Sequence, residues 1–151
     1  EISMIYSKKP IFFILFVFQF FVITAYAKDI EEKPRASDNT YSISTQGSIQ
    51  KLKLNEMGTF IINITTTQTG VSIKKEAPFK LIISANNLVV SQQKYGFKDG
   101  KKEKDTLSFT IPYSASKKGN ASLKADLDFF VCSEQWCEKR KETVAFSVTV
   151  E

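Results

Sequence analysis

The sequence predicts an all-β protein, because two patterns recur from Tyr41 to the C-terminus. Apolar and polar residues alternate in short runs, as they do in strands that bury one face. Clusters of Gly, Asn, Asp and Lys separate these runs and are typical of turns. No stretch shows a helical period of apolar residues. Seven to nine short strands of this kind predict an immunoglobulin-like antiparallel β-sandwich, with a β-barrel as the alternative.

Five runs show the alternation most clearly, and their apolar members are expected to face the core. These members are Phe60, Ile62 and Ile64; Phe79, Leu81 and Ile83; Leu107, Phe109, Ile111 and Tyr113; Leu123, Ala125, Leu127, Phe129 and Val131; and Val144, Phe146, Val148 and Val150. Weaker strands are expected at residues 48–54, 71–75 and 88–95. Pro112 lies inside a strand run, which predicts an edge position or a bulge because its nitrogen cannot donate to a ladder.

Residues 1–27 contain the three parts of a secretory signal peptide, with Met4 as the expected start. Two lysines form a basic region, residues 11–23 form an apolar stretch of 13 residues, and Ala-Tyr-Ala at residues 25–27 is the expected cleavage site. A helix of that length spans only about 20 Å of a bilayer core of roughly 30 Å, so an uncleaved membrane anchor is the secondary interpretation. We therefore expect an exported, periplasmic protein.

The remainder of the chain is expected to contain one domain. Residues 28–40, KDIEEKPRASDNT, are polar, contain one proline and lack an apolar period, which predicts a flexible tether. Residues 41–151 are the expected β-sandwich domain. A chain of this length is sufficient to bury a single core, and a second domain is not expected.

Charge and composition exclude several classes of function. The chain has 21 basic and 16 acidic residues, and removal of Lys8, Lys9 and Glu1 with the signal peptide leaves 19 and 15. This mild excess falls mostly in predicted turns, so nucleic-acid binding is not expected. The chain has no histidine, which excludes Ser-His and Cys-His catalysis. Two cysteines without a nearby carboxylate cluster do not complete a zinc site, so neither a metal nor another cofactor is expected.

Both cysteines, Cys132 and Cys137, lie in the stretch FFVCSEQWCEKRK at residues 129–141, together with the only tryptophan. Cys132 continues one predicted strand and Cys137 begins the next, so the four-residue loop between them places the cysteines opposite each other. Facing residues of an antiparallel pair lie about 4.5 to 5.5 Å apart at Cα, within disulfide reach. An exported chain with an even number of cysteines normally oxidises them.

The predicted disulfide has two interpretations, a structural bond that closes a hairpin or a redox pair that exchanges electrons with another protein. Closing a loop of about six residues stabilises a fold by roughly 2 kcal/mol, against about 4.7 kcal/mol for a loop of 100 residues. A bond at a hairpin tip therefore adds little global stability but lies within reach of a partner's thiolate. Trp136 and Phe130 are candidate cap or partner-contact residues, and Trp136 has packing onto the sandwich as its alternative role.

The run LKADLDFFVCSEQWCEKRKETVAFSVTV leads an apolar strand into two nearby cysteines and continues into a final strand. It resembles the cysteine-bearing end of the N-terminal periplasmic domain of DsbD, the disulfide bond corrector family. The stretch GTFIINITTTQTGVSIKKEAPFKLIISANN is similar to the same family, so the resemblance covers roughly residues 58–150. This chain has four residues between its cysteines, where the best-known members of the family have five.

The resemblance implies an immunoglobulin-like periplasmic sandwich whose cysteine pair shuttles electrons. It implies a thioredoxin-like protein or a membrane thiol-transfer protein as the partner. Cys137 would form the mixed disulfide with this partner, and Cys132 would resolve it. The alternative function is a non-enzymatic cell-envelope interaction domain with a structural hairpin disulfide, and a surface adhesin is a further possibility. The oligomeric state and the direction of electron flow do not follow from the sequence.

Overall fold

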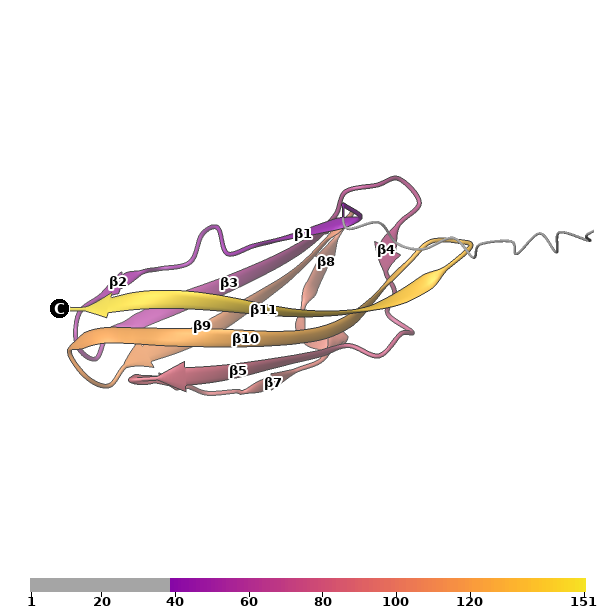
Figure 1. Ribbon diagram of the computed structural model, residues 1–151. Coiled ribbons are helices and arrows are strands. Elements are labelled where there is room, and N and C mark those ends of the chain that lie inside the picture. The colour runs from indigo at the N-terminus through magenta and orange to yellow at the C-terminus, as the bar shows by residue number, and fades with distance from the viewer. Residues whose placement is uncertain (1–38) are drawn as a thin grey trace, which may run out of the picture. The chain divides into compact units, whose positions relative to one another are not determined.

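The computed structural model describes residues 39–151, so the expected signal peptide and most of the expected tether lie outside the described residues. The described part forms two packed β-sheets with one short 3-10 helix, Phe97–Asp99 (Figure 1). This arrangement confirms the predicted immunoglobulin-like antiparallel β-sandwich. It contains eleven strands rather than seven to nine, because two short strands, Tyr41–Ser44 and Lys101–Glu103, form outside the predicted runs and the run 88–95 divides into two. The strand Lys101–Glu103 lies in the segment 98–105, which the sequence predicts as a loop, so that prediction was wrong.

The first sheet has five strands. Its order is β1 (Tyr41–Ser44), β3 (Met57–Thr66), β9 (Thr106–Ala115) and β6 (Leu88–Val90), and β8 (Lys101–Glu103) also pairs with β9. All of these pairs are antiparallel. β3 and β9 are the longest strands of this sheet and form its centre.

The second sheet has six strands. Its order is β2 (Lys51–Leu52), β11 (Cys137–Val150), β10 (Gly119–Cys132), β5 (Lys80–Asn86) and β7 (Lys94–Tyr95), and β4 (Ser72–Ile73) also pairs with β10. The pairs are antiparallel except for β2 with β11, which is parallel. Figure 1 shows β11 and β10 side by side along their length.

The core lies between the two sheets and is built mainly from the residues that the alternation predicts to face inward. All of them are buried except Phe79 and Val144, which are half-buried and pack against the core. Aromatic stacking joins the two sheets, since Phe60 of β3 and Phe146 of β11 stack with ring centroids 4.8 Å apart. Burial of this apolar surface is the main term that stabilises the sandwich.

Pro112 lies at a local edge within β9, as its position in the sequence predicts. β9 pairs with β8 through residues 106–108 and with β6 through residues 113–115. Between these two stretches, no other described strand pairs with that side of β9. The proline therefore lies where a backbone donor is not needed.

Tyr113 of β9 packs directly onto the backbone of β3. It is 1% exposed, and its hydroxyl donates to the backbone oxygen of Ile49. Burial raises the pKa of this phenol above its ordinary value. A Cβ atom at Gly58 would lie 2.6 Å from the Tyr113 ring, so only glycine allows the ring to approach this closely.

Gly58→Ala is expected to lower the free energy of unfolding by about 1 to 3 kcal/mol, because it overpacks the Tyr113 contact. The midpoint of urea unfolding measures this change. Gly96→Ala is the matched control, since its added Cβ would meet only the Asp99 Oδ2 atom at 3.8 Å. Equal unfolding midpoints for the two variants would contradict the contact.

Candidate functional site: the cysteine hairpin

The longest ladder of the sandwich brings the two cysteines together. β10 and β11 pair over all 14 residues of each strand, from Gly119 opposite Val150 to Cys132 opposite Cys137. The predicted four-residue loop is present, and the cysteines form a disulfide across it with their Cα atoms 4.1 Å apart. The disulfide expected from the sequence is therefore confirmed.

Ser133 organises the loop between the cysteines. Its Oγ accepts the backbone N–H groups of Gln135 at 3.1 Å and of Trp136 at 3.2 Å. Its own N–H donates to the backbone oxygen of Trp136 at 2.8 Å. Ser133 and Trp136 thus form a hydrogen-bonded pair of the hairpin. The cysteines occupy the next pair, which is not hydrogen-bonded, and in such pairs the Cα atoms approach most closely. The turn itself therefore brings the cysteines together.

The two cysteines differ in their access to solvent. Cys132 is 1% exposed, whereas Cys137 is exposed. Cys132 lies inside the sheet, with β11 on one side and Ser72 of β4 on the other. Cys137 lies on β11, which has no second neighbour at this point among the described strands. A group that arrives from solvent therefore meets Cys137 first.

Trp136 and Phe130, the candidate contact residues, are both half-buried. Trp136 packs against the hydrophobic core, and with the loop 68–71 it lines a depression of about 300 Å³ beside the disulfide. Phe130 lies opposite Lys139 in the ladder and shares the outer face of the sheet with Cys132. Trp136 therefore belongs to the turn and packs on the core, whereas Phe130 belongs to the outer surface next to the cysteines.

Charged residues occupy the inward face of β11 beside the disulfide, and the sequence analysis did not assign them to the site. Glu138, Arg140 and Glu142 lie opposite buried residues of β10, which places them on this face. Arg140 Nη2 lies 3.3 Å from Glu138 Oε2, and the Arg140 guanidinium lies 5.9 Å from the centre of the Tyr41 ring. The Tyr41 hydroxyl donates to Glu142. The alternation of inward and outward residues along the strand could have predicted these charges on the inward face, because they are in step with Val144, Phe146 and Val148.

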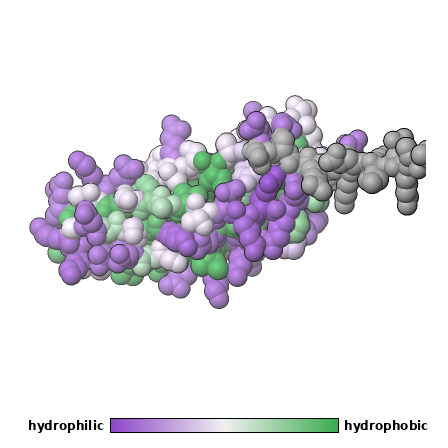
Figure 2. Space-filling view, in the orientation of Figure 1, coloured by the Kyte–Doolittle hydropathy of each residue, from purple (hydrophilic) through white to green (hydrophobic). Residues whose placement is uncertain are grey.

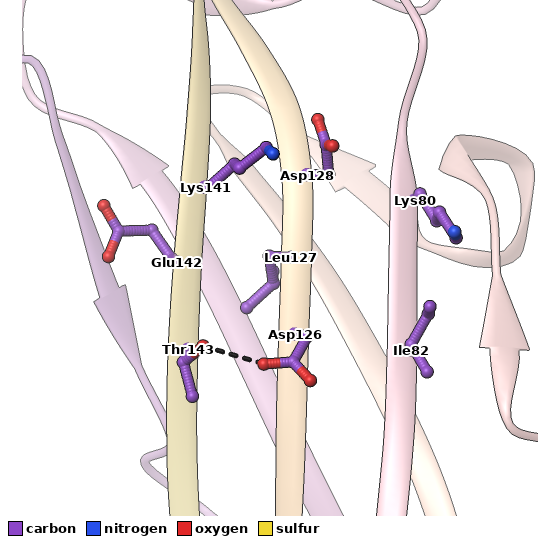
Figure 3. Close-up of a pocket in the computed structure, with 8 residues that line it drawn as sticks. All are labelled: Lys80, Ile82, Asp126, Leu127, Asp128, Lys141, Glu142 and Thr143. Carbon is purple, nitrogen blue, oxygen red and sulfur yellow. Dashed lines mark hydrogen bonds between the residues drawn. The ribbon is translucent and has the colours of Figure 1, made fainter.

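The outer face of β5, β10 and β11 has a shallow depression of about 290 Å³ (Figure 3). Acidic residues of β10 line it between basic residues of the two neighbouring strands. Near it, Asp128 Oδ2 pairs with Lys139 Nζ at 2.9 Å. Because both side chains are partly exposed, this ion pair adds little stability.

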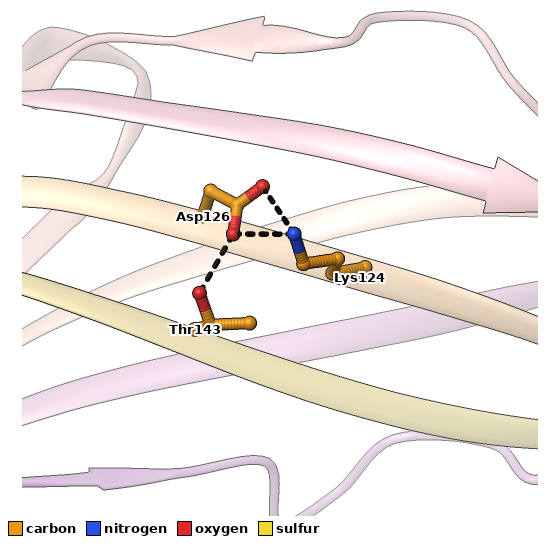
Figure 4. Close-up of polar contacts among 3 residues, drawn as sticks. All are labelled: Lys124, Asp126 and Thr143. Carbon is orange, nitrogen blue, oxygen red and sulfur yellow. Dashed lines mark hydrogen bonds and ion pairs between the residues drawn. The ribbon is translucent and has the colours of Figure 1, made fainter.

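Asp126 has the most extensive side-chain contacts on this face (Figure 4). Thr143 Oγ1 donates to its Oδ1 atom at 2.7 Å, and Lys124 Nζ lies 3.0 Å from its Oδ2 atom. The Thr143 hydrogen bond, followed by the Lys124 contact, lowers the pKa of Asp126 below its ordinary value. Both contacts favour the charged carboxylate.

Within residues 39–151, no three or more His, Cys, Asp or Glu side chains are grouped so that they could hold a metal ion. The same residues include no helix that is long and apolar enough to cross a membrane.

Comparisons with known proteins do not assign a family. No family model matches the chain, and no curated protein matches it. Among solved structures, a chain from the complex of zinc 2-glycoprotein and prolactin inducible protein from human seminal plasma is similar, with a TM-score of 0.48 and 12% identity over 76% of this chain and 100% of that chain. A Bacteroides thetaiotaomicron lipoprotein has a TM-score of 0.40 and 15% identity over 78% and 85%. These scores are too low to support a functional assignment.

Reduction of the disulfide is expected to lower the free energy of unfolding by about 2 kcal/mol, because the bond closes a loop of only about six residues. Urea unfolding of the oxidised and the reduced protein measures this difference. The Cys132→Ala/Cys137→Ala variant, in which dithiothreitol should change nothing, is the control. A loss of about 4 kcal/mol or more would instead make the bond a main support of the fold.

Thr143→Val is expected to raise the pKa of Asp126 toward its ordinary value, because the variant removes the hydrogen bond that favours the carboxylate. A carboxyl pKa that folding lowers contributes stability at pH values above the unfolded-state pKa, and this stability is lost as the pH falls through the folded-state pKa. NMR titration of the Asp126 carboxyl carbon measures the shift. Ser147→Ala on the same strand should leave the titration unchanged.

Proposed function

We propose that this chain is an exported thiol–disulfide exchange module that exchanges electrons with a thioredoxin-like or membrane thiol-transfer partner through Cys132 and Cys137. The observation that carries the proposal is the difference in exposure between the two bonded cysteines. Exchange requires one sulfur that an outside thiolate can reach and a second that remains close enough to reverse the reaction. The hairpin supplies both.

The exchange begins with the reduced protein, in which the Cys137 thiolate attacks one sulfur of a partner's disulfide. A mixed disulfide forms between Cys137 and the partner, and the partner's second sulfur leaves as a thiolate. The Cys132 thiolate then attacks the Cys137 sulfur, which restores the intramolecular disulfide and releases the partner as a dithiol. Two electrons pass to the partner, and the reverse sequence returns them.

The fold keeps the resolving sulfur in place during this cycle. The Ser133 hydrogen bonds and the β10–β11 ladder position the cysteine backbones independently of the sulfur–sulfur bond. Burial of Cys132 limits attack on it by other thiols while Cys137 is engaged. The DsbD resemblance, with Cys137 as the attacking and Cys132 as the resolving residue, supports the same assignment.

An exported location belongs to the same proposal. The expected signal peptide lies outside the described residues, and the formed disulfide suits the oxidising conditions of a periplasm or an extracellular space.

A second candidate function is a non-enzymatic cell-envelope interaction domain in which the disulfide is structural. The burial of Cys132 favours it, because a bond with one shielded sulfur resists reduction. The reduction potential separates the two functions, since structural disulfides typically lie below about −300 mV. A potential in the range of thioredoxin-like proteins would support exchange, and a lower one would support the structural role.

Cys132→Ala is expected to trap a mixed disulfide through Cys137 when it is produced in a periplasm, because the resolving thiolate is missing. Non-reducing gel electrophoresis should show an adduct that dithiothreitol releases, and mass spectrometry would identify the partner. Cys137→Ala is the matched control and should trap at least ten-fold less, about the difference expected between an exposed and a shielded thiol. Circular dichroism would verify that both variants fold. Equal trapping by the two variants, or none by either, would reject the exchange function.

A further inference from the structure

β11 leaves most of one side open for pairing. Among the described residues, it pairs with β10 along its whole length but with β2 only at Thr149 and Val150. The side of β11 that faces away from β10 is therefore a sheet edge from Cys137 to Val148. A strand edge of this kind is a template for pairing with another chain.

The existing bonds show which backbone groups this edge offers. The Thr149 N–H donates to the Gln50 oxygen, away from β10. Because the direction of backbone groups alternates along a strand, Thr143, Ala145 and Ser147 also direct their N–H and C=O groups toward the open side. Each of these residues can accept one hydrogen bond from an added strand and donate one to it.

The edge has two halves of opposite character. Residues 138–142 are all charged, and charges that point inward or stand on an edge prevent strands from adding. Residues 143–148, TVAFSV, carry no charge and no proline and are rich in strand-forming residues. Figure 2 shows hydrophilic residues gathered over the part of the sandwich nearer the hairpin, and apolar residues that reach the surface over its middle. The neutral half alone lacks protection.

This neutral half is packed from its inward side and accessible from its outward side. Phe146 and Val148 are buried, and the Phe146 ring stacks on Phe60, which fixes the strand from its inward side. The outward side chains of Thr143, Ala145 and Ser147 are exposed and small. An added strand would therefore meet a preformed backbone without bulky side chains in front of it.

β2 blocks one pairing with a second copy of this chain, the pairing of the two neutral segments with each other. Two copies that paired their residues 143–148 antiparallel would each extend their residues 137–142 beyond Val148 of the other copy. That position is occupied by β2, which lies alongside Thr149 and Val150. The open edge ends there. A register that avoids β2 would set the charged residues 138–142 of one copy against the edge of the other, which disfavours pairing. The edge therefore suits a short uncharged segment that can turn away before β2.

We infer that the Thr143–Val148 edge of β11 binds an extended, uncharged segment of a partner protein, which adds to the sheet as a further strand. The segment is about five or six residues long, lacks proline, and alternates β-branched or aromatic residues with small polar ones. Such main-chain pairing supplies affinity, and the side chains on each face supply selectivity. The inference does not depend on thiol exchange, since neither cysteine belongs to this edge segment.

Amide hydrogen exchange tests the inference on the full-length protein, labelled with nitrogen-15 and purified after export. In the free protein, the Thr143, Ala145 and Ser147 amides should exchange at least about ten-fold faster than those of Val144, Phe146 and Val148, which face β10. The probe is a synthetic peptide of three Thr-Val repeats with one lysine at each end. At saturation it should slow exchange at the first three amides by about ten-fold or more. The same peptide with two central prolines should have no effect.

A matched pair of variants tests the position. Ala145→Lys extends the protecting charges into the neutral half and should weaken peptide binding at least about five-fold. Ser122→Lys places the same charge on the outer face of the interior strand β10 and should leave binding unchanged. Absence of any slowing by the peptide would overturn the inference. Slow exchange of the Thr143, Ala145 and Ser147 amides in the free protein would also overturn it. Slow exchange that depends on protein concentration would indicate that a second copy covers the edge. Slow exchange that disappears when residues 28–38 are removed would indicate that the chain's own segment covers it.

Discussion

The ladder between β10 and β11 is the constraint on which the rest of the structure depends. It is the longest pairing in the sandwich, and the alternate apolar residues of β10 point from it into the core. Each of these large apolar side chains contributes about 1.5 to 3 kcal/mol through burial, and this burial fixes the register, because a shift by one residue would turn them all to solvent. The same register determines that Cys132 faces Cys137 at one end of the ladder.

The position of each cysteine in the sheet gives it a different chemical environment. Cys132 lies on an interior strand and is shielded by β4, while Cys137 lies on an edge strand and is exposed. In the proposed exchange, Cys137 would react with an outside thiol while Cys132 is held nearby to resolve the mixed disulfide. A purely structural bond does not need cysteines that differ in exposure, although it is compatible with them. As a structural bond it would contribute little to the stability of the whole fold, because it closes a short loop.

The proposed exchange site and the proposed strand-binding edge lie on the same strand, with a charged segment between them. Residues 138–142 carry charges on both faces, and Tyr41 covers part of their inward side through its contacts with Glu142 and Arg140. These charges keep other strands from adding next to the disulfide and leave Cys137 open to thiols. The neutral segment that follows lacks them and keeps its backbone groups available. A partner with an extended segment could therefore bind this domain without covering its disulfide.

The sequence by itself determined the fold class, the inward face of each long strand and the pairing of the two cysteines. These features are local, because a period of two and a four-residue loop act through neighbouring residues. It did not determine that Cys132 would be buried, that Glu138 and Arg140 would lie beside Tyr41, or that half of β11 would remain an open edge. These features depend on which strands become neighbours, such as β4 beside Cys132 and β2 beside Thr149. Contacts between segments far apart in the chain decide that order, so only the tertiary structure could supply it.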